Sequence, residues 1–211
     1  MESTRSSNIR QGITVEILTI VWMVIEMAAS IAAGIAARSV LLTAFGIDSL
    51  IELVSGAVLL WRLTAESKQG DLESVELAEQ RAAWVVAVTL GLLCLYVLCS
   101  SLAGLLWHSQ PENSLPGIGI ALAAIVIMPI LAISKRRIAA RIDSQALAGD
   151  AVNSWTCAYM AGTVLVGLLL NMLFGWWWIE YVAAIIFLFW LGRETWEAFE
   201  EARGKARQED I

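Results

Sequence analysis

The chain has 211 residues, of which 58% are hydrophobic and only 16% are charged, and its mean hydropathy is +0.69. Water-soluble domains of this length contain fewer apolar residues, so the composition excludes an ordinary soluble protein and indicates a lipid bilayer as the solvent. The net charge is −6 at pH 7, and we expect no nucleic-acid partner.

Six hydrophobic stretches follow one another along the chain. A helix needs about 20 mainly apolar residues to cross the hydrocarbon core of a bilayer. The stretches that meet this requirement are about 14–37, 39–63, 82–107, 115–134, 146–171 and 174–193. We therefore expect an all-α integral membrane protein in which six transmembrane helices form one domain (14–193). A cytoplasmic N-terminal segment (1–13) precedes this domain, and a short cytoplasmic tail (194–211) follows it.

The basic residues lie almost entirely on one side of this topology. All Lys and Arg residues except Arg38 fall in the N-terminal segment, the second loop, the fourth loop (which includes Lys135) or the C-terminal tail. By the positive-inside rule these segments face the cytoplasm, so both termini are expected there. The first stretch is too long for a signal-peptide core and is expected to be retained. We expect a multi-pass protein of the plasma membrane, namely the inner membrane of a bacterium.

Acidic residues interrupt the predicted spans, although an ionised side chain at the bilayer centre costs about 2.5–3.5 kcal/mol. Glu26 lies in the first span, Asp48 in the second and Asp150 in the fifth. Glu16 and Glu180 lie nearer to an interface, where snorkelling or helix capping explains them. The interior acids therefore indicate a functional site.

Asp48 and Glu52 are four residues apart in the segment GIDSLIELVSG, so a helix places both carboxylates on one face. Like charges at this spacing repel each other unless they are protonated or share a cation. No Lys or Arg lies in the middle of any predicted span. A proton or a bound metal ion is therefore the expected counter-ion.

The fifth span offers a second polar face. Asp150, Asn153 and Cys157 are three and four residues apart in ALAGDAVNSWTCAY and form one stripe of a helix. Carboxylate, amide and thiolate groups on this stripe would complete a metal site with Asp48 and Glu52. The alternative is that Asn153 forms hydrogen bonds between helices and that Cys157 only packs.

These residues and the six spans resemble the transmembrane part of the cation diffusion facilitator (cation efflux) family. The segment LLTAFGIDSLIELVSGAVLLWRL is similar to the family's acid-bearing second span, and the resemblance covers nearly the whole chain. It implies that Asp48 and Glu52 of the second helix bind a metal ion together with Asn153 and Cys157 of the fifth. The amide and the thiol replace the His and Asp that are usual in the family's fifth helix. The cytoplasmic C-terminal domain of most members is expected to be lacking here.

The resemblance implies efflux of a divalent cation by proton-coupled alternating access rather than an enzymatic reaction, with no cofactor besides the transported ion. Mixed oxygen and sulfur ligands favour Zn²⁺, with Fe²⁺, Mn²⁺ and Cd²⁺ as alternatives. Asp150 is expected to tune the site or to receive protons, and Glu26 to line the path. Any homodimer would have to form through the transmembrane helices.

Two other interpretations stay open. A non-transporting membrane scaffold or partner subunit would use the same polar residues only as helix-packing contacts and would bind no metal. A transporter of organic cations would need aromatic rings near the acids, but Trp155 and Tyr159 fall on other faces of the fifth span. An intramembrane serine hydrolase with a histidine base is not expected, because the single histidine, His108, lies at the outer end of the third span beside Trp107, away from any nucleophile at membrane depth.

Overall fold

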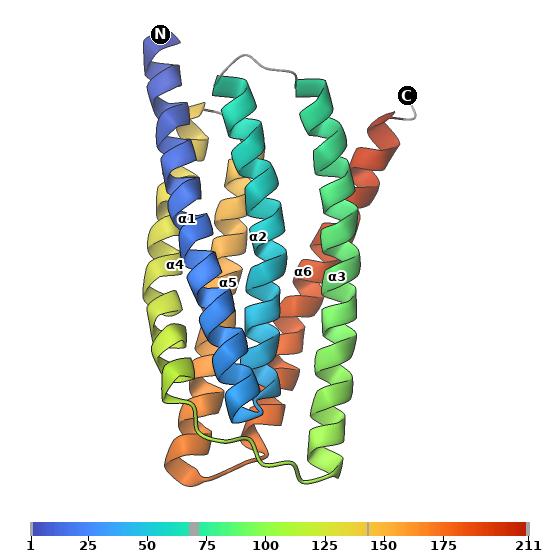
Figure 1. Ribbon diagram of the computed structural model, residues 1–211. Helices are drawn as coiled ribbons and strands as arrows, with labels where there is room; N and C mark the ends of the chain where they lie inside the picture. The colour runs from blue at the N-terminus through green and yellow to red at the C-terminus, as the bar shows by residue number, and fades with distance from the viewer. Residues whose placement is uncertain (1, 68–71, 143, 210–211) are drawn as a thin grey trace.

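The computed structural model describes residues 2–67, 72–142 and 144–209. Within these ranges every regular element is a helix: α1 (Glu2–Ala37), α2 (Val40–Ser67), α3 (Leu72–Leu106), α4 (Leu115–Ile142), α5 (Gln145–Phe174) and α6 (Ile179–Glu209). The helices run up and down in one bundle, and the start of α1 and the end of α6 lie at the same end of it (Figure 1). The prediction of an all-α protein with six helices is confirmed.

Five helices in the described part of the chain are long and apolar enough to cross a membrane: Asn8–Ala37, Val40–Ala65, Trp84–Leu106, Leu115–Ile142 and Ala146–Phe174. The chain is therefore a multi-pass membrane protein. The sixth predicted span is also a helix, but α6 begins at Ile179 and continues to Glu209. Its uncharged stretch lies between Glu180 and Arg193. This stretch is only about 18 Å long at about 1.5 Å per residue, against about 30 Å of hydrocarbon, so a spanning α6 must carry a charged residue into the membrane.

Serine side chains cap three of the helices. The side-chain oxygens of Ser39, Ser114 and Ser144 each accept a hydrogen bond from the backbone N–H three residues later, at 3.0, 3.1 and 3.3 Å. At the other end of α5, Gly175 adopts a φ of 64°, a left-handed conformation that glycine reaches without strain. These caps pair backbone groups at helix ends, which lipid cannot do.

Helices α1 and α2 approach each other closely at two glycines. A Cβ atom on Gly34 would lie 2.7 Å from the backbone N of Thr43, and one on Gly46 would lie 2.8 Å from the backbone N of Ile31. A larger side chain at either position would push the helices apart, and small residues commonly permit such contacts in membranes. The close packing brings Glu26 of α1 within hydrogen-bonding distance of α2.

Helix α4 continues to Ile142, past the predicted end of the fourth span at 134. Lys135, which the sequence placed in a loop, therefore lies inside the bundle with no exposed surface. The assignment of Lys135 to the fourth loop is therefore wrong, because the helix continues beyond the point where its hydropathy falls. Glu16 is also fully buried, so snorkelling does not explain it. Glu180 is also fully buried, in the first turn of α6, and neither of its carboxylate oxygens accepts a hydrogen bond from the described residues, so the structure does not show the expected cap.

Candidate metal centre

Three carboxylates from two helices meet in the interior of the bundle. Asp48 and Glu52 lie one turn apart on α2, and Glu194 comes from α6. One carboxylate oxygen of each lies within 4.8 Å of those of the other two. Three oxygens bound at about 2.2 Å around one ion lie about 3–4 Å apart, so a contraction of about 1 Å would let all three bind the same cation.

The carboxylate group lies in the interior of the bundle, in a cavity that Arg62 and Arg193 also line. The exposed fractions of Asp48 and Glu52 are 0% and 4%. Both oxygens of each, and Oε2 of Glu194, are buried and make no hydrogen bond within the described part of the chain. Buried charges without partners are strongly unfavourable, so the group requires protons or a bound cation.

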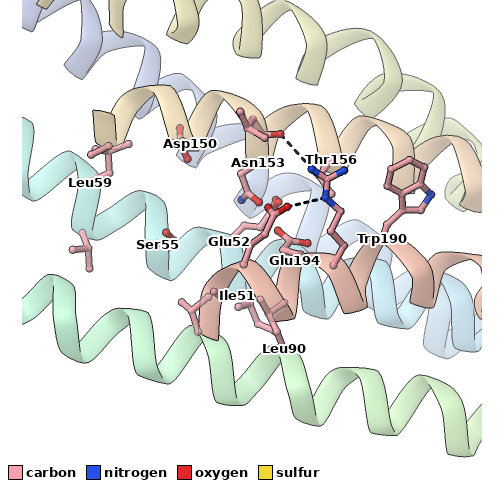
Figure 2. Close-up of a pocket in the computed structure, with 18 of the residues that line it drawn as sticks. Ile51, Glu52, Ser55, Leu59, Leu90, Asp150, Asn153, Thr156, Trp190 and Glu194 are labelled. Atoms are coloured by element: carbon pink, nitrogen blue, oxygen red, sulfur yellow. Dashed lines mark hydrogen bonds and ion pairs between the residues drawn. The ribbon is translucent and has the colours of Figure 1, made fainter. Parts of the chain in front are cut away.

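A cavity of about 590 Å³ leads to these carboxylates between α2, α3, α5 and α6. Glu52 and Glu194 lie close together in it, and the side chain of Asn153 extends toward Glu52 from α5 (Figure 2). Along α2 the lining runs from Ile51 to Arg62, and on α5 it reaches Ala146 in the first turn. These are the helix ends that lie on the same side of the bundle as the chain termini (Figure 1), so the cavity extends from the acids toward that side.

The polar stripe predicted on α5 is divided among three surroundings. Asn153 lines the cavity with Glu52 and Glu194. Cys157 is fully buried, and its thiol donates a hydrogen bond of 3.4 Å to Glu26. Asp150 also lines the cavity, but its carboxylate is paired with a lysine. The spacing therefore predicted the residues that lie near the site, but it did not predict that they face different partners.

Glu26 is a fully buried carboxylate whose hydrogen bonds come from three helices. Besides the Cys157 thiol, the indole Nε1 of Trp22 on α1 and the hydroxyl of Ser49 on α2 donate to it, each at 2.7 Å. Ser49 is the residue after Asp48, so this network adjoins the carboxylate group. Three donors can hold a carboxylate in a fixed position without a metal ion.

Lys135 forms a second buried cluster with Glu16 and Asp150. Its Nζ atom lies 3.1 Å from a carboxylate oxygen of Glu16 and is hydrogen-bonded to Asp150. The three residues come from α4, α1 and α5. Asp150, predicted as a proton acceptor or tuning group, therefore has a cationic partner, Lys135, at the wall of the cavity.

The sequence interpretation missed Glu194, which it assigned to the cytoplasmic tail. The last apolar stretch ends at Arg193, so the acid that follows falls outside the predicted span. The signal that could have identified it is the short uncharged stretch of α6. A helix too short in apolar residues must place a flanking charged residue at membrane depth, where an ionised group costs about 2.5–3.5 kcal/mol unless it has a partner.

Comparison with known proteins identifies the family of the chain. Residues 17–204 match the cation efflux transmembrane domain. The cation-efflux pump FieF of Shewanella oneidensis is 26% identical over 93 residues, which cover 44% of this chain. The match spans 31% of the length of that relative. Because the family match extends over most of the sequence, the chain belongs to the cation efflux family.

Proposed function

We propose that this protein exports a divalent metal ion across the membrane in exchange for protons. The observation that carries the proposal is the buried group of Asp48, Glu52 and Glu194 at the inner end of a cavity, in a chain of the cation efflux family. The family consists of transporters rather than enzymes. The similarity to a cation-efflux pump supports the same activity.

The direction of transport follows from the cavity and the distribution of basic residues. The positive-inside rule assigns the side of the bundle that holds the termini to the cytoplasm. The cavity then admits an ion from the cytoplasm to the carboxylates, which must lose their protons before they bind a metal. A change to an outward-facing form would release the ion when external protons replace it, as alternating access requires.

The proposed ligands are Asp48 and Glu52 of α2, with Asn153 and Cys157 as donors from α5. Asn153 already faces Glu52 across the cavity (Figure 2). Cys157 would have to exchange its contact with Glu26 for the ion. Asp150 and Glu26 are then accessory groups beside the path, the first held by Lys135 and the second by its three donors.

Zn²⁺ is the ion that the mixed oxygen and sulfur ligands of the sequence favour, with Fe²⁺, Mn²⁺ and Cd²⁺ as alternatives. We place the protein in the bacterial inner membrane, where a homodimer would form through the transmembrane helices. Its partners are then the lipid bilayer, the metal ion and protons.

Metal accumulation in cells tests the activity. Bacteria that lack their own efflux systems are loaded with each of the four ions, with and without the protein. We expect the wild type to lower the intracellular content of at least one ion, and the Glu52→Gln variant at equal abundance to leave it unchanged. Equal accumulation of all four ions with and without the wild-type protein would instead favour a non-transporting scaffold.

A further inference from the structure

We propose that Glu194 of α6 is a metal ligand, and that the site therefore prefers ions with an affinity for oxygen, Mn²⁺ or Fe²⁺, over the softer Cd²⁺. This inference rests on the proposed function and ranks the ions that the proposed function gives as alternatives to Zn²⁺. It assigns a role in metal binding to a helix other than the two that supply the ligands implied by the family resemblance.

The geometry gives Glu194 the position of a ligand. One of its carboxylate oxygens is within 4.8 Å of oxygens of both Asp48 and Glu52. Its Oε2 atom is buried and unpaired among the described residues, as are both oxygens of Asp48 and of Glu52, whose side chains are 0% and 4% exposed. The unpaired acids of α2 therefore point at the position where an ion would meet Glu194.

The nearest cation on α6, Arg193, lines the same cavity but is paired with another acid. Arg193 donates a hydrogen bond of 2.7 Å to Glu197, and both of these side chains are largely exposed, at 62% and 53%. The arginine next to Glu194 in the sequence is thus engaged with Glu197. Glu194 is directed into the cavity beside Glu52 (Figure 2).

The donors on α5 leave a place for a ligand from α6. Asp150 is paired with Lys135, and the thiol of Cys157 donates to Glu26. Asn153 contributes only a neutral amide. A third carboxylate for a divalent ion is therefore supplied by Glu194 rather than by the fifth helix.

The chemical class of the ion follows from this ligand set. Three carboxylates and one amide outnumber a single thiol, whichever way Cys157 turns. Oxygen ligands suit Mn²⁺ and similar ions, whereas thiolates select softer ones such as Cd²⁺. An ion bound in this way would have ligands from both α2 and α6. Its binding and release would therefore affect the positions of both helices.

Binding of Mn²⁺ to the purified full-length chain in detergent micelles is the test, followed by the loss of the free-ion electron paramagnetic resonance signal. We expect Glu194→Gln to weaken binding by at least about tenfold. Glu200→Gln, a matched change at an exposed position two turns further along α6, should leave it within about twofold. Asp48→Asn should abolish binding.

The outcomes separate this inference from the proposed function. If Glu194→Gln binds Mn²⁺ like the wild type while Asp48→Asn does not, Glu194 is not a ligand but the proposed site stands. If the folded wild type binds none of Mn²⁺, Fe²⁺, Zn²⁺ and Cd²⁺, both fail. Should Glu194→Gln not fold, Glu194→Asp replaces it, because the shorter carboxylate must also weaken binding if Glu194 is a ligand.

A change of ion preference gives an independent reading. Glu194→Cys puts a sulfur atom in the place of the third carboxylate, so the ratio of Cd²⁺ to Mn²⁺ affinity should rise by at least about tenfold over the wild type. Glu200→Cys should not change this ratio. An unchanged ratio in Glu194→Cys would overturn the assignment.

Discussion

The Nζ atom of Lys135 lies 3.1 Å from a carboxylate oxygen of Glu16, and neither side chain has any exposed surface. The same ammonium group donates a hydrogen bond to Asp150, which lines the cavity on the side of the proposed metal site that faces the chain termini. One lysine therefore ties α1, α4 and α5 together by charge. It also neutralises part of the negative charge that the bundle would otherwise contain.

Replacement of Lys135 should destabilise the fold strongly. In Lys135→Met the fully buried carboxylate of Glu16 and the partly buried carboxylate of Asp150 lose their cation, and the loss of one partner of a buried ion pair typically costs about 3–5 kcal/mol. Thermal unfolding of the purified protein in detergent measures the effect. The control is Arg136→Met, the same change at the exposed neighbouring position, where we expect a change below about 0.5 kcal/mol. Equal unfolding temperatures of the two variants would show that the ion pair contributes little.

The contact between α1 and α2 predicts a position-dependent effect of glycine substitutions. In Gly46→Ala the added Cβ would meet the backbone of Ile31 at 2.8 Å, so we expect a loss of about 1–3 kcal/mol. Gly119→Ala on α4 meets nothing within 4 Å and should be neutral or stabilising by up to about 1 kcal/mol. The same unfolding measurement compares them. A Gly46→Ala protein as stable as the Gly119→Ala protein would contradict the close helix contact.

The predicted role of Cys157 as a ligand can be tested by a single-atom change. Serine in Cys157→Ser can still donate to Glu26, but its hydroxyl is a harder donor than sulfur. We expect Cd²⁺ binding to weaken by about tenfold and Mn²⁺ binding to change by less than about twofold. Cys99→Ser, at an exposed position on α3, is the control. Unchanged Cd²⁺ affinity in Cys157→Ser would remove the thiol from the ligand set.

The helices and the central acids were predictable because their signals are local. Hydropathy over about 20 residues identifies a membrane helix, and a spacing of four residues places Asp48 and Glu52 on one face. The structure brings these two acids together as expected, at the inner end of a cavity.

The charge pairing between helices was not predictable in the same way. Lys135 belongs to a Lys-Arg-Arg run that resembles a cytoplasmic loop, and only the packing of α4 against α1 and α5 shows that this one residue faces inward. Glu194 follows an arginine that ends the apolar stretch, so its place beside Glu52 depends on the tilt and rotation of α6. Sequence spacing defines the faces of each helix but not which faces meet, which is why the stripe of Asp150, Asn153 and Cys157 has three different sets of partners.

Metal-driven proton movement in proteoliposomes tests the central claim most directly. Wild-type protein and Asp48→Ala are reconstituted at equal density with a pH-sensitive dye inside, and Zn²⁺, Fe²⁺, Mn²⁺ and Cd²⁺ are added in turn. We predict a saturable proton flux with at least one ion in the wild type and none in Asp48→Ala, while both proteins keep the same helical content and elute as the same species. Equal flux in the two proteins, or no flux from the folded wild type with any of the four ions, would contradict transport through the carboxylates of α2.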